Sequence, residues 1–261
     1  MRSSLFASAA LVLVVSVPIR ALETPTGPWC TTAREYVTTL DFLRGHTEFA
    51  VPETEAREMA REVSRTCTGS GGRFIAVMLL LTRAGLTGKD ASREALAIAK
   101  RSDADAATFV TVFRMSYLEE YLDLELPDAL RLAHSLTSEF AGDMLGVRED
   151  FETLVHFCVK ERGLDLPRPK CAELATRIAR KGEPWSGGIA DSFLKVFRFV
   201  AGREGAHLTT ATALSIAEDV IAGGPGAAEN FIQGYRYAVS PTGLGLTEAS
   251  ALKFAREMAG R

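Results

Sequence analysis

A short phrase of the form Ala-x-x-hydrophobic-Ala recurs six times along the chain and constrains what it can fold into. One copy is shifted by one residue, and consecutive closing alanines are 34 to 42 residues apart. These closing residues are Ala60, Ala99, Ala133, Ala175, Ala217 and Ala255. The interval accommodates one pair of antiparallel helices, and repetition at such a period is typical of a stacked array. The repeat therefore predicts an all-α protein.

A second phrase precedes each alanine phrase and carries large apolar side chains, as in Phe109…Phe113-x-Met115. An offset of four residues keeps two side chains on one helix face. Five such aromatic phrases begin at Phe74, Phe109, Phe151, Phe193 and Phe231, and a divergent sixth begins at Tyr36. Nowhere does the sequence show the alternation expected of a strand. We therefore predict about twelve helices in six antiparallel hairpins, stacked as a right-handed superhelical array.

Over about residues 30–259, this pattern resembles the broad class of αα-hairpin solenoids, which includes tetratricopeptide and Sel1-like repeats. The resemblance implies an architecture only. The spacing varies, and the Trp, Gly-Tyr and Pro positions of a tetratricopeptide repeat are missing. No functional residue is transferred from this class.

The first 21 residues have the character of an export signal. Arg2 is followed by an apolar run over 5–17 and by the small-residue site Ile19-Arg20-Ala21. The alternative is a membrane anchor, but the run is short against the roughly 20 residues that span a bilayer. We predict a signal peptide at 1–21, one helical-repeat domain at 22–261, no later membrane segment, and a periplasmic or secreted protein.

The net charge disfavours one class of binding partner, and the cysteines indicate disulfide bonds. A formal net charge of −3 disfavours nucleic-acid binding, which needs a positive field. Four cysteines in an exported chain favour two disulfides over a metal site or reactive thiols, because no C-x-x-C motif occurs. Residues at equal depth in an antiparallel hairpin lie side by side. The hairpin register therefore predicts the pairs Cys30–Cys67 and Cys158–Cys171.

The sequence contains no catalytic signature that we recognise, and it predicts no cofactor and no metal. The acids Glu119-Glu120 and Glu149-Asp150…Glu152 are expected on solvated faces or at helix starts. Residues 102–105 are expected to form a helix N-cap rather than a calcium loop. Residues 69–72 are expected to form a glycine-rich linker, although their N–H groups offer a conceivable anion site.

One set of charged residues stands out, because a cation occupies the fifth position after the first residue of four consecutive aromatic phrases. These residues, the basic stripe, are Arg114, His156, Arg198 and Arg236. Equivalent positions in a repeat array lie in a column, and arginine forks bind carboxylates well. The alternative is ordinary exposed arginines paired with acids such as Glu218 or Glu229. Trp185, in a loop, is a further candidate ligand contact.

The predicted function is therefore an exported, non-catalytic protein that binds a protein or an anionic polymer along the basic stripe. The first alternative is a cell-envelope hydrolase on an all-α fold, with a groove carboxylate such as Glu119 or Glu152. The second is a structural protein that self-associates. Its last helix, predicted at 246–258, would expose Leu252 and Met258 to a partner.

Overall fold

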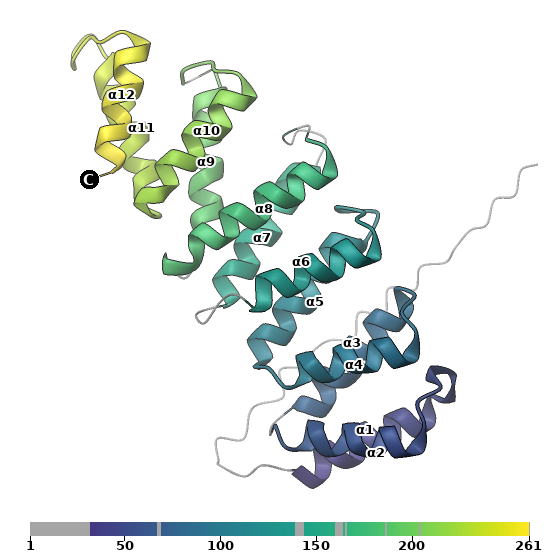
Figure 1. The fold of residues 1–261 in the computed structure, drawn as a ribbon. Helices are drawn as coiled ribbons and strands as arrows, with labels where there is room; N and C mark the ends of the chain where they lie inside the picture. The colour runs from purple at the N-terminus through teal and green to yellow at the C-terminus, as the bar shows by residue number, and fades with distance from the viewer. Residues whose placement is uncertain are drawn as a thin grey trace, which may run out of the picture. The chain divides into compact units, whose positions relative to one another are not determined.

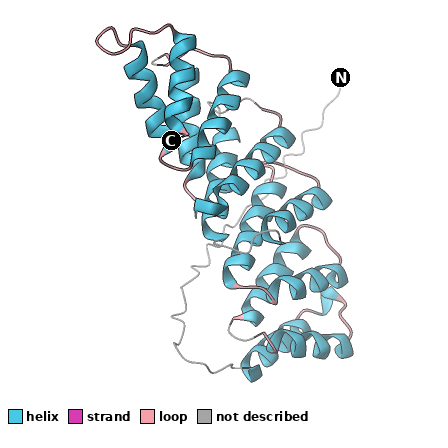
Figure 2. Cartoon of the chain, turned by 60° about the vertical axis from the view of Figure 1, so that its left-hand side comes forward, coloured by secondary structure: helices cyan, strands magenta, loops and turns pink. Residues whose placement is uncertain are grey.

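A computed structural model describes residues 32–66, 69–138, 144–159, 164, 166–185, 187–203 and 205–260. The predicted signal peptide at 1–21 lies outside these residues. The described part of the chain contains twelve α-helices, three short 3₁₀ helices and no strand (Figures 1 and 2). The α-helices are α1 Thr32–Gly45, α2 Glu53–Ser64, α3 Ser70–Arg83, α4 Gly88–Ala99, α5 Asp103–Tyr117, α6 Leu126–Ser138, α7 Met144–Val159, α8 Arg168–Gly182, α9 Ile189–Ala201, α10 Thr210–Val220, α11 Ala227–Val239 and α12 Glu248–Ala259. The 3₁₀ helices are η1 Thr47–Phe49, η2 Glu183–Trp185 and η3 Ile221–Gly223.

Each odd-numbered helix packs most extensively against the helix that follows it, which gives six helix pairs from α1–α2 to α11–α12 (Figure 1). The all-α prediction and the pairing of the helices are confirmed. Successive pairs also touch through their first helices, in the order α1, α3, α5, α7, α9 and α11, and the second helix of a pair often contacts the next pair as well. The first helix of a pair is therefore covered on several sides, which explains its wide apolar surface.

The two recurring phrases supply the core. All six closing alanines have no exposed surface, since a small side chain lets neighbouring helices approach closely. The five phenylalanines that begin aromatic phrases are also fully buried. Full burial of such a side chain contributes about 1.5–3 kcal/mol. The residues that recur in the sequence are thus the residues that form the core of each helix pair.

Hydroxyl side chains begin several helices. The hydroxyls of Thr87, Thr209 and Thr247 accept a hydrogen bond from a backbone N–H in the first turn of α4, α10 and α12. The N-cap predicted at 102–105 is confirmed at Ser102, which also forms a reciprocal capping box with Asp105 at the start of α5. The segment predicted as a linker at 69–72 is different, because only Gly69 precedes the helix and the other three residues form the first turn of α3.

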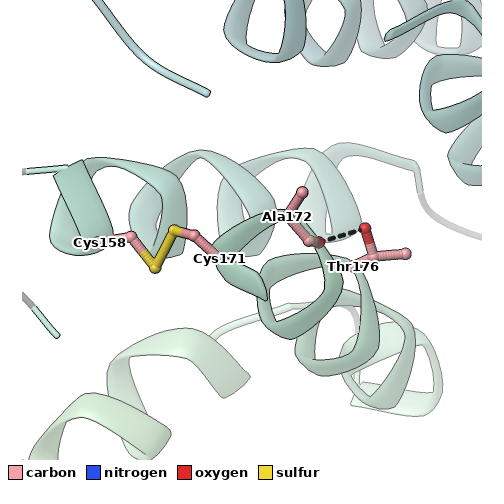
Figure 3. Close-up of a disulfide and its surroundings, with 4 residues drawn as sticks. All are labelled: Cys158, Cys171, Ala172 and Thr176. Atoms are coloured by element: carbon pink, nitrogen blue, oxygen red, sulfur yellow. Dashed lines mark hydrogen bonds between the residues drawn. A yellow bond between two sulfur atoms is a disulfide. The ribbon is translucent and has the colours of Figure 1, made fainter. Parts of the chain in front are cut away.

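The predicted bond between Cys158 of α7 and Cys171 of α8 is present (Figure 3). It links two helices of one pair across 13 residues of sequence. The predicted bond between Cys30 and Cys67 falls outside the described residues and stays a prediction.

Two buried carboxylates connect adjacent hairpins. Glu35 of α1 accepts hydrogen bonds from the N–H groups of Gly71 (2.6 Å) and Gly69 (3.3 Å) at the start of α3. Asp150 of α7 accepts a hydrogen bond from the N–H of Ala190 (2.9 Å) in the first turn of α9. The N-terminus of a helix attracts an anion through its free N–H groups and its dipole. Each acid therefore caps the start of the first helix of the next hairpin.

Asp150 corrects the prediction of a solvated acid, because it is 2% exposed. Its second oxygen, Oδ2, has no hydrogen-bond partner among the described residues. A side chain at Gly182 would overlap this oxygen, so the end of α8 needs glycine there. Burial raises the pKa of Asp150, and the N–H groups of Ala190, Ile189 and Gly188 offset part of that rise.

Among the described residues, no helix has both the length and the apolar character needed to cross a bilayer.

Candidate functional site

The basic stripe lies near the C-terminal ends of four first helices: Arg114 on α5, His156 on α7, Arg198 on α9 and Arg236 on α11. The three arginines are exposed and His156 is half-exposed. A cation in the last turns of a helix interacts favourably with the helix dipole. The four side chains thus occupy equivalent places on successive helix pairs.

Two of the arginines lie over aromatic rings of the preceding hairpin. The Cζ atom of Arg198 is 5.2 Å from the ring centroid of Phe157, and that of Arg236 is 5.5 Å from the ring centroid of Phe199. Each ring ends the aromatic phrase of the hairpin before it. Tyr237 holds the same place in the final phrase and is 55% exposed, since no hairpin follows α12 in the described residues. A cation–π contact of this kind contributes about 0.5–1 kcal/mol at an exposed site.

Arg198 and Arg236 line one cavity of about 440 Å³ between α9 and α11. Four basic side chains and one acid contribute to its wall, together with three uncharged residues. The described residues that line it are Lys195, Arg198, Phe199, Gly202, Arg203, Glu229, Ile232 and Arg236. The excess of cations makes this cavity an environment for a bound anion.

Glu229, the acid of this cavity, is already bound. Its carboxylate accepts hydrogen bonds from Gln233 (2.9 Å) and from Lys195 (3.1 Å). These two bonds, with the charges of Lys195 and Arg236, lower the pKa of Glu229. The carboxylate is thus engaged mainly by Lys195 and Gln233, and the described residues of the lining keep a surplus of positive charge.

The acids expected to neutralise the stripe bind other cations. Glu218 pairs with Arg177 of α8, at 2.7 and 2.9 Å, and Glu229 pairs with Lys195. Neither Arg198 nor Arg236 forms an ion pair or a side-chain hydrogen bond with any described residue. Within the described part of the chain, the N–H groups of these two arginines have no side-chain acceptor.

The other stripe residues have different surroundings. The ring of His156 meets Tyr121 edge-on with 5.4 Å between centroids, and its Nε2 lies 3.9 Å from Glu152. Arg114 and His156 do not line the cavity between α9 and α11. The structure brings Arg198 and Arg236 together at one cavity and leaves the other two on neighbouring helices.

Trp185 lies in η2, is 48% exposed and is not part of this cavity. Its ring contacts the backbone of Gly224, where a Cβ atom would come within 3.0 Å of the indole. Trp185 precedes α9, whereas Arg198 lies nine residues after Ile189 at its start, about 14 Å along the helix axis. The indole therefore covers the turn before α11, at the opposite end of α9 from the arginines.

The acids considered for catalysis are dispersed. Glu119 is exposed and lines a cavity of about 380 Å³ in the α5–α6 turn, whereas Glu152 lies beside His156. Glu35 and Asp150, the acids that are buried among the described residues, bind helix N–H groups. The described part of the chain holds no cluster of His, Cys, Asp and Glu suited to a metal ion.

The chain matches no protein-family model, no curated protein and no solved structure.

Sequence reasoning missed two features of this region. Lys195, which lies inside the phrase that begins at Phe193, and Arg203, which follows it, also line the cavity. The contacts of Arg198 and Arg236 with a ring of the preceding hairpin were also not predicted. One signal was present in the sequence, because His156-Phe157 and Arg198-Phe199 repeat a cation beside a ring in consecutive phrases.

Proposed function

We propose that this protein is an exported, non-catalytic helical-repeat protein that binds a partner protein along the basic stripe. One observation carries the proposal: Arg198 and Arg236 lie over rings of the preceding hairpin, border one cavity and form no ion pair with a described residue. An arginine packed against a ring loses less freedom when it binds a carboxylate than an unsupported one. The export signal, the superhelical stacking and the Cys30–Cys67 bond are parts of the same proposal.

A protein partner fits this surface better than a uniform anionic polymer. Polyanions are recognised through an extended positive field, whereas this chain has a net charge of −3. Acids also lie beside the cations: Glu152 is next to His156, and Glu229 pairs with Lys195 in the cavity. These acids would repel a continuous row of charges but tolerate separate carboxylates on a folded or extended polypeptide.

The two alternatives have less support. A hydrolase needs a carboxylate of raised pKa in a cleft beside a second polar group. Asp150 is the acid of raised pKa among the described residues, and it is enclosed by backbone and Gly182. Self-association was predicted to use Leu252 and Met258 as exposed residues of α12, but both are half-buried and Leu252 packs against the core.

The experiment compares three forms of residues 22–261, immobilised and exposed to the proteins of the native cell envelope and medium. They are the wild type, an Arg114→Ala/Arg198→Ala/Arg236→Ala variant of the stripe, and a control. The control, Arg61→Ala/Arg93→Ala/Arg131→Ala, removes the same charge from exposed positions on α2, α4 and α6.

We expect a protein that binds the wild type and the control with the same Kd and the stripe variant at least about tenfold more weakly, since hydrogen bonds to charged groups contribute about 1.5–3 kcal/mol each. The Kd is measured with the purified partner by calorimetry. Partners that bind all three forms equally would refute the role of the stripe.

A further inference from the structure

We infer that the last helix pair of one copy of this chain, α11–α12, packs on the first helix pair, α1–α2, of a second copy. The two copies would then meet head to tail, in the way that successive helix pairs meet within one copy. The inference goes beyond the proposed function and does not depend on it, because it uses no residue of the basic stripe.

The junction between α9 and α11 shows which apolar side chains are covered when one helix pair packs on another. Phe199 is the last residue of its aromatic phrase, and Ile232 is the second residue of the next phrase. Both line the cavity between the two helices, and they are 8% and 7% exposed. A ring of the earlier helix and an aliphatic side chain of the later helix are thus covered at the same junction.

The corresponding side chains are uncovered in the last and the first helix pair. Tyr237 of α11 corresponds to Phe199 and is 55% exposed, and Val37 of α1 corresponds to Ile232 and is 52% exposed. These two are the most exposed of the large apolar side chains that the structure describes. Single exposed apolar residues are common on protein surfaces, but these two occupy positions that the repeat covers elsewhere. Packing of α11–α12 on a second α1–α2 would bury both.

The second helices carry charges that continue the repeat in the same way. At three junctions, the second residue after one closing alanine pairs with the first residue after the next closing alanine. These ion pairs are Glu62–Lys100, Arg177–Glu218 and Asp219–Arg256. In the last and the first helix pair, the corresponding residues are Glu257 and Arg61. Both are exposed, and neither forms an ion pair with another residue in the described ranges.

The signs of these two charges favour a second copy as the occupant. Glu257 of one copy and Arg61 of the next are opposite charges at the position where the repeat forms ion pairs. Complementary charges of this kind fix the orientation of a partner and disfavour wrong ones. The first helix pair of a second copy therefore matches the last helix pair at both the apolar and the charged position.

One further position differs from the internal junction, and it differs on both sides. Arg236 lies over the ring of Phe199, whereas the corresponding residue of α1 is Asp41. The ring that would meet Asp41 is Tyr237, which is the only tyrosine at the end of an aromatic phrase. A phenol O–H donates to a carboxylate. A hydrogen bond can therefore replace the cation–π contact at this junction.

The test measures the mass of purified residues 22–261 by sedimentation velocity. A head-to-tail contact leaves one free end on each side, so association continues past two copies. The mass of the wild type should rise past that of a dimer between about 1 and 100 µM protein. Arg61→Glu and Glu257→Arg each place like charges at the junction, and each should weaken association at least about tenfold. Tyr237→Ser should also weaken it, and circular dichroism checks that each variant is folded.

Two combinations restore opposite charges and make the test specific. The double variant Arg61→Glu/Glu257→Arg exchanges the two signs, so its association should return. An equimolar mixture of the two single variants should also associate, because every junction between them joins opposite charges. The control Arg131→Glu makes the same change of charge on α6, in the third helix pair, and should behave like the wild type.

Three outcomes would overturn the inference. The first is a wild type that stays monomeric over the whole range. The second is a dimer that grows no further and responds to only one of the two single charge changes, since its copies would then meet through identical ends. The third is a double variant and a mixture that both stay dissociated. The capture experiment on the stripe is separate, because its control already lacks Arg61 and is expected to bind the partner like the wild type.

Discussion

Replacing Glu35 by alanine tests whether a buried carboxylate holds the first two hairpins together. Gly71 is the second residue of α3, so its N–H has no acceptor within the helix. The carboxylate of Glu35 supplies that acceptor at 2.6 Å, in a buried position. Hydrogen exchange of the Gly71 amide should therefore be slow in the wild type because its N–H donates to Glu35.

The cost of the change follows from the two hydrogen bonds. A buried N–H group left without a partner costs about 1–3 kcal/mol, which applies to Gly71. Gly69 lies at the surface and its N–H can turn to water, so it adds little. The lost attraction between an anion and the helix terminus adds about 1 kcal/mol. We expect Glu35→Ala to destabilise the contact between the first two hairpins by about 2–4 kcal/mol. The equilibrium constant for local opening at Gly71 should therefore rise roughly thirty- to several-hundred-fold.

The assay is hydrogen exchange of the Gly71 amide, followed residue by residue, with urea unfolding by circular dichroism as a second measure. Glu35→Gln, which keeps one oxygen acceptor, should fall between the wild type and Glu35→Ala. Asp41→Ala removes an exposed acid from the same helix and serves as the control. The explanation is wrong if the Gly71 amide stays protected in Glu35→Ala, or if both alanine variants unfold at the same urea concentration.

Two further changes test the hairpin formed by α7 and α8 and its junction with α9. Cys158→Ala/Cys171→Ala removes the disulfide that closes a loop of 13 residues. Because the unfolded chain gains conformational entropy, the free energy of unfolding should fall by about 3 kcal/mol. Urea unfolding curves that coincide with those of the wild type would contradict this expectation. Asp150 has a pKa raised above its ordinary 3.8, so its ionisation destabilises the fold, and stability should fall as the pH rises through the interval above that value. Asp150→Asn removes this contribution, so the urea midpoint of the variant should rise relative to that of the wild type between about pH 3.5 and 7. A difference in midpoint that stays constant over this range would refute the raised pKa of Asp150.

The core of each hairpin was predictable because its signal is local. Offsets of four residues place Phe109 and Phe113 on one helix face, and small closing alanines mark where the second helix packs. Equal depth from the turn was enough to pair Cys158 with Cys171. Helix starts at Thr87 and Ser102 also follow from neighbouring residues alone. The capping and the packing within one hairpin act over fewer than about forty residues.

The residues that join one hairpin to the next were not predicted. Asp150 looks like its exposed neighbour Glu149 in the sequence, yet it is buried against α8 and α9. The residue before each aromatic phrase is polar in all six copies: Glu35, Arg73, Thr108, Asp150, Ser192 and Asn230. In the first, fourth and fifth copies it bonds to backbone at the start of the next hairpin, and Arg73 bonds to the carbonyl of Ala99. The last copy, Asn230, is exposed because no hairpin follows α12 in the described residues.

The sequence by itself determined the class of the fold, the pairing of the helices and the apolar face of each, because periodicity within a helix decides which side chains share a face. Only the tertiary structure decided which carboxylate reaches which helix start, and that Arg198 and Arg236 lie over rings at one cavity without an ion pair to any residue that the structure describes. Those contacts depend on the rotation and the displacement between adjacent hairpins. Neither quantity is encoded in the spacing of a repeat, since many stacking angles bury the same alanines and phenylalanines.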